Sequence, residues 1–507
     1  MKRFMTLALV SALVLGASSM VYANVCAFDA VPAATILFPF VTLDYNAPVS
    51  GVSTTFSITN VSSEAQVVHV TVWTDFSAAI LDFNIILTGY DVIAMNIRDI
   101  LITGQLPVTL YEAHSSNEGI AANGPVSEGN QLNGSWVNPG MAVPEPTDDA
   151  LDGRCNPSNP SYPGLYATPI PPGFLGLFQG YLQISQTVDR LHSNDCEKFL
   201  YDDPYTLTPT PFWAERDTTY PTNMYITADV VQNCNKLFPD APGYFAQEVR
   251  FENVLIGDMI WTSIADRYSE ASTAVMIEAS MYLAEVATLT TAGNPISFYH
   301  RYAQLLDGVS DYREPLPTAW AFRYIGAGMA TVGTDIRVWK GSTMFDWTYD
   351  LERTGTVKVS PDSLIASNCH AYTYYAWDED EMVTTVSSVP WSMPGGESVI
   401  PNLIPLETQE VPVEQFDTPG AFGWMLFVWP ASNEPAVGHP TANFDDYYQT
   451  WMGVRFNAFG DWSAAMDGAV MANFNCFSDQ VLPNIGINYS YVDEFGYVTS
   501  PNIMPAN

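Results

Sequence analysis

Two clusters of carboxylates are the residues in this chain whose types and spacing best suit a chemical role. Asp148, Asp149 and Asp152 stand beside a turn glycine, Gly153. Calcium prefers several hard oxygen ligands at one point, so this cluster is the first candidate for a calcium site. Its spacing does not match the loop of an EF-hand.

A run of four acidic residues begins at Asp378, directly after an aromatic-rich segment. In an extended chain, alternate side chains face the same side, so Asp378 and Asp380 form the second calcium candidate. A solvated turn is nevertheless the favoured interpretation of the run. Carboxylates in this abundance also permit a glycosidase pair, which requires two carboxyl groups roughly 5 to 9.5 Å apart. No cofactor other than calcium is expected.

Histidine and serine chemistry has no local signature here. The chain has 6 histidines, no two of them within a few residues of each other, and it contains neither H-E-x-x-H nor G-x-S-x-G. Nothing selects one serine as a nucleophile. His69 is interpreted as a strand residue bonded to a neighbour, because the sequence places no second histidine or carboxylate with it.

The N-terminus predicts export. Lys2 and Arg3 precede an apolar run at 5–17, and 21–23 form the small-x-small pattern that a signal peptidase accepts. The run is too short to span a membrane as a stable helix, so we expect a cleaved signal peptide and no transmembrane segment after cleavage. The mature protein is expected in the periplasm, on the cell surface or outside the cell.

All 6 cysteines lie beyond this cleavage site. In an oxidising compartment, an even number of cysteines is most simply read as disulfides, of unknown connectivity. No C-x-x-C pair is present, which disfavours structural zinc. The disulfide candidates are Cys26, Cys155, Cys196, Cys234, Cys369 and Cys476.

The charge balance is strongly acidic. Without Lys2 and Arg3, 16 basic residues remain against 55 acidic ones, a formal charge of −39, while 47% of the chain is hydrophobic. The composition therefore indicates a folded protein, and the electrostatic field of its negative charge repels nucleic acid. The same field favours the binding of divalent cations or of a cationic partner. Aromatic residues at 13% are compatible with a protein or glycan partner at the cell surface.

Short alternating segments between turn residues predict β-strands. Segments 54–59 and 67–74 flank a polar turn and are expected to form a hairpin. Segment 270–288 is compatible with a helix or two strands, and we favour strands. Further strands are expected at 82–87, 92–97, 225–231, 253–261, 320–325, 335–339, 371–377, 423–429 and 451–459.

The expected fold class is mainly β, with two immunoglobulin-like β-sandwich domains joined by an irregular, loop-rich middle segment. The expected divisions are a signal peptide at 1–23, an N-terminal β-sandwich at 24–112 that can recruit strands from 174–190, a long loop excursion at 113–173, an irregular β-rich middle segment at 174–290 and a C-terminal β-sandwich at 291–507.

Three short patches carry a resemblance to known proteins. A-T-I-L-F-P-F at 34–40, the segment 81–92 and R-E-P-L-P-T-A-W at 313–320 resemble motifs of a loosely defined set of exported bacterial β-rich proteins with no assigned activity. The resemblance implies a bacterial, exported β-protein. It carries over no catalytic or binding residue.

These observations favour a non-enzymatic exported or cell-surface protein that serves adhesion, assembly or ligand display. The alternative is a carbohydrate-binding protein or glycoside hydrolase, suggested by the aromatic residues and paired acids. A third class, an outer-membrane barrel, is disfavoured by the six cysteines and by the polar end at 504–507.

Overall fold

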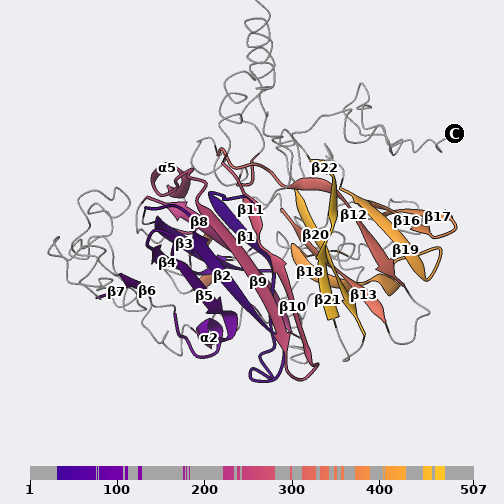
Figure 1. The fold of residues 1–507 in the computed structure, drawn as a ribbon, viewed down its shortest axis with the longest axis horizontal. Helices are drawn as coiled ribbons and strands as arrows, with labels where there is room; N and C mark the ends of the chain where they lie inside the picture. Colours follow the sequence, from indigo (N-terminus) through magenta and orange to yellow (C-terminus); the bar gives the residue numbers. More distant parts are fainter. Residues whose placement is uncertain are drawn as a thin grey trace, which may run out of the picture.

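A computed structural model describes part of the chain, and that part is mainly β, built of several antiparallel sheets (Figure 1). The described residues are 31–64, 66–75, 77, 79–106, 109–111, 124–127, 175–176, 179, 182, 221–232, 237–239, 243–279, 297–299, 311–326, 332–341, 348–350, 356–358, 372–388, 404, 406–429, 449–458 and 463–473.

The largest sheet has nine strands and occupies the left half of Figure 1. Its strands are β1 (Thr35–Leu43), β2 (Ser53–Asn60), β3 (Gln66–Thr74), β4 (Ala79–Leu87), β5 (Val92–Asn96), β8 (Thr222–Val231), β9 (Leu255–Ser263), β10 (Tyr268–Thr273) and β11 (Val275–Ile277). They follow the order β10-β9-β2-β1-β8-β3-β4, with β5 paired to β2 and β11 paired to β1. Strand β11 follows β10 directly in the chain, and whereas β10 pairs with β9, β11 pairs with β1.

Strands from distant parts of the sequence alternate within this sheet. Strand β8 lies between β1 and β3, with Thr35 opposite Asp229 and His69 also opposite Asp229. The segment 174–290 therefore supplies four strands to a sheet that begins near residue 35. The strand preference for 270–288 agrees with β10 and β11 as far as that segment is described.

The hairpin expected between 54–59 and 67–74 is wrong. Strand β2 pairs with β9, β5 and β1, whereas β3 pairs with β4 and β8. The buried Asn60 side chain explains the redirection, because its amide donates to the carbonyl oxygens of Glu64 (2.6 Å) and Thr88 (3.0 Å). These bonds turn the chain away from β2 after its last residue, and the hairpin forms instead between β3 and β4.

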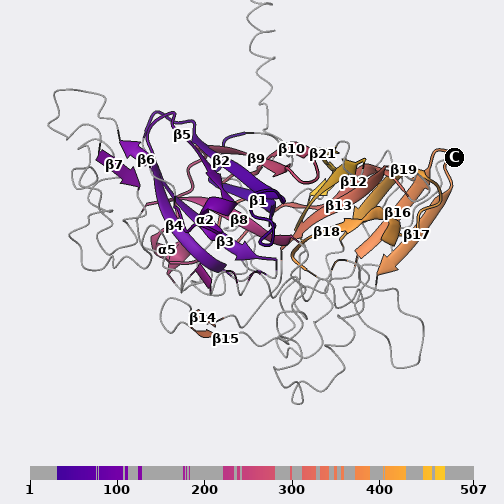
Figure 2. The same cartoon turned by 90° about the horizontal axis from the view of Figure 1, so that it is seen from below.

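Two further sheets lie in the right half of Figure 1, and Figure 2 shows them from below. The five-stranded sheet has the order β17-β16-β19-β12-β22, and the four-stranded sheet has the order β18-β13-β20-β21. Their strands are β12 (Pro317–Ile325), β13 (Gly333–Lys340), β16 (Tyr372–Asp378), β17 (Val383–Ser388), β18 (Thr408–Pro412), β19 (Phe422–Val428), β20 (Thr450–Asn457), β21 (Ser463–Asp467) and β22 (Ala469–Asn473).

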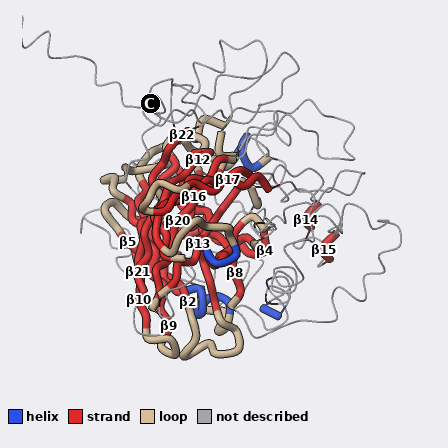
Figure 3. Tube along the Cα trace, turned by 90° about the vertical axis from the view of Figure 1, so that its right-hand side faces the viewer, coloured by secondary structure: helices blue, strands red, loops and turns tan. Residues whose placement is uncertain are grey.

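The remaining elements are short. Among the named elements, two isolated strand pairs and three short helices remain, and Figure 3 shows how little helix accompanies the strands. They are β6 (Thr109–Tyr111) with β7 (Gly124–Ser127), β14 (Thr348–Asp350) with β15 (Thr356–Lys358), α2 (Ile97–Leu101), α5 (Tyr244–Gln247) and the 3-10 helix η3 (Val413–Gln415).

One hydrophobic core runs through all three large sheets. Between the five- and four-stranded sheets, Trp320 is fully buried, and its indole nitrogen donates to the Thr450 carbonyl oxygen at 3.1 Å. Between the nine- and four-stranded sheets, the core includes Phe40, Trp261 and Trp339. Apolar alternation in the sequence produced these inward-facing rows, and the predicted strand segments listed above all coincide with observed strands.

Pro39 shapes the join between the nine-stranded and four-stranded sheets. Proline cannot donate to a strand ladder, and the register of β1 against β8 shifts between Phe38 and Val41. The carbonyl oxygen of Pro39 accepts a hydrogen bond from the hydroxyl of Thr408 in β18 at 2.6 Å. The register shift at Pro39 thus leaves a carbonyl oxygen of β1 that binds Thr408 of β18, 369 residues further along the chain.

Candidate functional site

The second predicted calcium site lies at the end of β16. The Oδ1 atom of Asp378 accepts the backbone N–H groups of Asp380 (3.0 Å) and Met382 (2.9 Å), which stabilises a tight turn. Glu381 adopts a left-handed backbone in this turn, with φ 62°. The carboxylate of Asp380 is exposed. The geometry therefore gives Asp378 a role in the turn, as the solvated-turn interpretation expects.

The other predicted site residues, Asp148, Asp149, Asp152 and all six cysteines, lie outside the described residues. Within the described ranges, no group of three or more histidine, cysteine, aspartate or glutamate side chains is placed to hold a metal ion. The calcium and disulfide assignments stay predictions.

His69 is a buried strand residue bonded to a neighbour, as expected. Its Nδ1 atom lies 2.8 Å from Oδ1 of Asn84, the residue opposite it on β4. The expectation that no carboxylate accompanies it is wrong, because Asp82 Oδ2 lies 3.6 Å from its Nε2 atom. The sequence placed Asp82 thirteen residues away, and only the β3–β4 pairing brings the two together.

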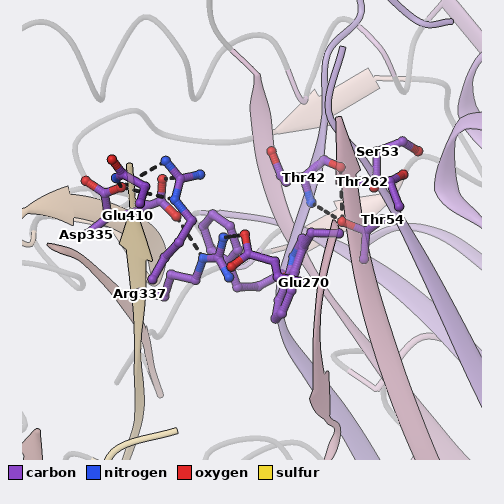
Figure 4. Close-up of polar contacts among 12 residues, drawn as sticks. Thr42, Ser53, Thr54, Thr262, Glu270, Asp335, Arg337 and Glu410 are labelled. Atoms are coloured by element: carbon purple, nitrogen blue, oxygen red, sulfur yellow. Dashed lines mark hydrogen bonds and ion pairs between the residues drawn. The ribbon is translucent and has the colours of Figure 1, made fainter. Parts of the chain in front are cut away.

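The strongest concentration of charge lies where the nine-stranded and four-stranded sheets meet (Figure 4). Arg337 of β13 donates from Nη2 to Glu270 of β10 and from Nε to Glu410 of β18, both at 2.7 Å. Its guanidinium also lies over the Trp261 ring, 4.2 Å from the centroid. Arg337 and Glu270 are almost completely buried, so each charge depends on the other for its compensation.

A second arginine extends this network. Arg455 Nη2 lies 2.8 Å from Asp335 Oδ2, and Arg455 Nη1 lies 3.4 Å from Glu410 Oε1. Burial and the neighbouring Glu410 charge raise the pKa of Asp335 to about 6. The two arginines outweigh burial at Glu410 and hold its pKa below the ordinary value. We call Glu270, Asp335, Arg337, Glu410 and Arg455 the joint cluster.

A second buried polar cluster fastens the segments near residues 244, 299 and 313 to the sheet. Asp229 accepts hydrogen bonds from the hydroxyls of Thr35 (2.6 Å), Tyr244 (2.7 Å) and Tyr299 (3.0 Å). Arg313 is fully buried, and its Nη1 atom donates to Asp311 at 2.8 Å. Burial, reinforced by the Asp229 charge, raises the pKa of both tyrosines well above the ordinary value.

Lys340 ends β13 inside the protein. Its side chain is fully buried, and its Nζ atom donates to the carbonyl oxygen of Ile404. Burial lowers the pKa of this lysine to about 7, although the nearby Glu407 carboxylate acts in the opposite direction. Tyr225 Oη lies 3.3 Å from Glu407 Oε1 and 2.7 Å from Ser77 Oγ, which links the lysine environment to the nine-stranded sheet.

A small aromatic-lined pocket lies beside these clusters, between the nine-stranded and four-stranded sheets. It is partly open and has room for about one water molecule beyond its walls. We call it the aromatic pocket. The buried side chains that line it are Trp73, Tyr225, Thr227, Phe298, Tyr299 and Trp339.

An aromatic pair lies on the other face of the five-stranded sheet. The half-buried Trp377 and Trp424 stand opposite each other on β16 and β19, with ring centroids 4.0 Å apart and planes 9° apart. Tyr375 stacks against Trp377 at 5.8 Å. Arg323 is exposed and stands opposite Trp424 on β12, so a charged donor adjoins the rings.

Sequence patterns did not predict the roles of Arg337 and Lys340 or the aromatic pocket. A signal for the two cations was present, because they stand beside the apolar residues of I-R-V-W-K at 336–340 in a chain with only 18 basic residues. A charged residue inside such a pattern indicates a buried partner. The partners themselves come from other sheets, and alternation along one strand contains no information about them.

Comparison with known proteins adds no assignment. Neither a protein-family model, nor a curated protein, nor a solved structure matches this chain. The helices in the described ranges are all too short or too polar to cross a membrane.

Proposed function

We propose that this chain is a non-enzymatic, exported bacterial protein whose β-sheets form a rigid body that displays a binding surface for a protein or glycan partner. Its sheets would belong to two immunoglobulin-like β-sandwich domains. The observation that carries the proposal is the joint cluster. Arg337 is bonded to Glu270 of one sheet and to Glu410 of another, so its charge is used to hold sheets together.

Other buried charges support the same interpretation. Arg313 donates from Nε to the hydroxyl of Thr35 in β1 and lies close to Asp229 of β8, and Lys340 donates to the backbone carbonyl oxygen of Ile404. In each case the buried group bonds to a different segment of the same chain. Such contacts hold separate segments in one arrangement, which suits a protein that must present its surface outside the cell.

Export and oxidation can be tested together on protein produced with its own N-terminus in a bacterial host. We expect intact mass to show a chain that begins at Asn24 and carries no lipid on Cys26. Alkylation under denaturing conditions should label none of the six cysteines before reduction. A product that retains residues 1–23, or three or more free thiols, would overturn the export and disulfide parts of the proposal.

The non-enzymatic part needs its own experiment. Purified protein is incubated with panels of chromogenic glycosides, esters and peptides, and turnover is compared with that of an inactive control preparation. We expect no turnover above the control. Turnover that co-purifies with the protein, and that a substitution in this chain abolishes, would contradict the proposal.

Glycan binding is a second candidate, favoured by the Trp377 and Trp424 pair. Aromatic rings on a sheet face stack against the apolar face of a sugar ring, and Arg323 can donate to hydroxyl groups. Because the chain carries a net charge of −37, a neutral glycan is favoured over an anionic one.

A glycan array tests this candidate with matched variants. Trp377→Ala and Trp424→Ala should each weaken binding to neutral glycans at least tenfold. Tyr90→Ala, which removes an aromatic ring that is 73% exposed in the turn between β4 and β5, is the control and should bind as the wild type does. Equal losses in all three variants, or no glycan bound by the wild type, would exclude this surface as the site.

A further inference from the structure

Strand β17 ends the five-stranded sheet, and among the described strands it pairs on one side only. It lies antiparallel to β16 over its whole length, with no shift in register. Figure 1 and Figure 2 both place it at the outer end of the sheet. One row of its backbone groups therefore has no ladder partner among the described strands. We call this row the free edge.

The hydrogen bond that closes the turn between β16 and β17 shows which groups lie on the free edge. The backbone N–H of Asp378 donates to the carbonyl oxygen of Met382 at 3.1 Å. Bonded and non-bonded pairs alternate along an antiparallel ladder, so Thr384 belongs to the next bonded pair. The N–H and C=O groups of Val383 and Thr385 consequently point away from β16.

The sequence of β17 leaves the free edge unprotected. V-T-T-V-S-S at 383–388 contains no charged residue and no proline, and four of its six residues are β-branched. Natural proteins usually block such edges with charge, proline or a bulge, because a row of unpaired N–H and C=O groups pairs with other extended chains. Val383 is 53% exposed and Thr385 is also exposed, so both side chains are open to solvent.

Two other sheet edges are covered by described residues. Strand β10 lies beside β21 where the nine-stranded and four-stranded sheets meet. At β18, the backbone N–H groups of Glu407 and Thr408 donate to the carbonyl oxygen of Asp75 at 2.8 and 3.3 Å. These edges are engaged with the rest of the chain, whereas β17 presents its edge at the end of a sheet.

An acidic turn adjoins the free edge. The run at 378–381 connects β16 to β17, and the side chains of Glu379, Asp380 and Glu381 are exposed. The whole chain has a net charge of −37, so a second copy would bring like charge to this surface. A positively charged partner would instead be attracted. Charge complementarity therefore favours a basic occupant.

We propose that the free edge of β17 binds an extended, basic segment of a partner protein by strand addition. The N–H and C=O groups of Val383 and Thr385 would bond to the backbone of the segment, and its basic side chains would lie against the acidic turn. All pairs in this sheet are antiparallel. An antiparallel segment would have its C-terminal end beside the turn, so we expect its basic residues there.

This proposal rests on the display function proposed above, and it specifies the chemistry of one partner. The contact at the free edge is made by backbone groups, so it is separate from the candidate glycan surface around Trp377 and Trp424. The two surfaces can be tested independently.

Fluorescence anisotropy on the full-length exported protein tests the proposal with labelled synthetic peptides. The probe is S-V-T-V-S-V-K-R-K, which has its basic residues at the C-terminal end. An order control, K-R-K-S-V-T-V-S-V, has the same composition, and a charge control, S-V-T-V-S-V-E-E-E, is acidic. We expect saturable binding of the probe, binding of the order control that is about fivefold weaker at low ionic strength, and no binding of the charge control.

Two variants test whether the backbone of β17 makes the contact. Thr385→Pro removes an N–H on the free edge, and an edge strand tolerates proline where the N–H faces solvent. Affinity for the probe should fall by about tenfold. Thr385→Val is the matched control, because it keeps the N–H and a β-branched side chain, and it should bind as the wild type does. A circular dichroism melt confirms that both variants are folded.

Probe peptides that are N-methylated at alternate residues make the same test on the wild type. In an added strand, alternate N–H groups face β17 and the others face solvent. N-methylation of one set should abolish binding, and N-methylation of the other set should preserve it. This measurement decides the proposal if Thr385→Pro does not fold.

The acidic turn has its own variant. Glu379→Gln with Asp380→Asn removes two exposed charges and leaves the Asp378 carboxylate that holds the turn. Affinity for the probe should fall by about threefold at low ionic strength, and its dependence on salt should become weaker.

Several results would overturn the proposal. These are no saturable binding of the probe, equal affinity for the probe and either control peptide, equal affinity of Thr385→Pro and Thr385→Val, and equal effects of the two N-methylated sets. An unchanged affinity in the variant of the acidic turn would also overturn it. None of these results would exclude display through the Trp377 and Trp424 surface, whereas enzymatic turnover by this chain would contradict the display function without changing the affinity for the probe.

Discussion

Arg337 and Glu270 form an ion pair between two sheets, with Nη2 and Oε1 2.7 Å apart and both side chains almost completely buried. A buried pair of this kind is costly to break from one side, because the remaining charge loses its compensation without regaining water. The pair therefore constrains how the nine-stranded and four-stranded sheets meet, whatever its net contribution to stability.

Removing Arg337 alone should destabilise the protein strongly. Arg337→Met leaves Glu270 buried without its partner, and we expect the free energy of unfolding to fall by about 3–5 kcal/mol. The double variant Arg337→Met with Glu270→Met removes both charges and should recover at least half of that loss. Chemical denaturation with tryptophan fluorescence measures all three proteins. A double variant as unstable as the single variant would show that the pair itself, and not the uncompensated charge, provides the stability.

Asp335 should make the protein less stable as the pH rises from about 4 to 6. Its pKa in the folded protein is about 6, so the folded state holds a proton in this range that the unfolded chain has already released. Above pH 6, Asp335 is ionised in the folded protein, and the whole of this loss in the free energy of unfolding is present. Asp335→Asn removes this titration, so the stability of the variant relative to the wild type should rise by about 1–3 kcal/mol between pH 4 and pH 7.

The control for this prediction is Asp258→Asn, which removes one negative charge from an exposed position on β9. Comparing the two variants at each pH separates the environment of Asp335 from general charge effects. If the relative stability of Asp335→Asn is the same at pH 4 and pH 7, the raised pKa of Asp335 is wrong.

Alternation along the sequence predicted where strands occur but not which strands become neighbours. The β2 and β3 segments were recognisable because apolar and polar residues alternate within each of them. Their separation into different pairings depends on Asn60, whose side chain bonds to the carbonyl oxygen of Glu64 in the following turn and to that of Thr88 beyond the next two strands. A side chain that satisfies carbonyl oxygens in three dimensions leaves no periodic signal.

The candidate sites show the same contrast between residues that could be predicted from one segment and contacts that depend on how segments pack. Asp378 lies in a turn that acidic and polar composition made predictable. Glu270 and Arg337 come from different sheets and meet only when the nine-stranded and four-stranded sheets pack. His69 shows both outcomes, because its strand position was predictable and its neighbour Asp82 was not. A site formed within one segment can be predicted from sequence. A site formed between segments requires knowledge of which strands pair, in which register, and how the sheets pack.

Calcium should stabilise the protein beyond the effect of ionic strength, and the gain should come from Asp148, Asp149 and Asp152. Asp378 already uses Oδ1 to hold its turn, so Asp378→Asn with Asp380→Asn should keep the calcium-dependent rise in Tm. Replacing the three earlier aspartates by asparagine should abolish it. The measurement is a thermal melt in millimolar calcium against sodium at matched ionic strength. A rise no larger than that in sodium would exclude a calcium site.

Lys340 should make the protein more stable as the pH rises from about 7 to 10. Its pKa is lowered to about 7 in the folded protein, because burial disfavours the charged amine. Between pH 7 and the ordinary lysine pKa, the unfolded chain therefore binds one proton more than the folded protein, and the free energy of unfolding rises with pH. Lys340→Met removes this dependence.

The variant should consequently be more stable than the wild type at pH 6, by about 2–4 kcal/mol, and this advantage should shrink towards pH 10. Denaturation at both pH values measures the difference, and titrations elsewhere in the protein cancel in the comparison. Arg323→Met, at an exposed position on the neighbouring sheet, controls for the loss of a positive charge and should show no such trend. A constant difference between Lys340→Met and the wild type across this range would mean that Lys340 stays charged inside the protein, compensated by Glu407 and the Ile404 carbonyl oxygen.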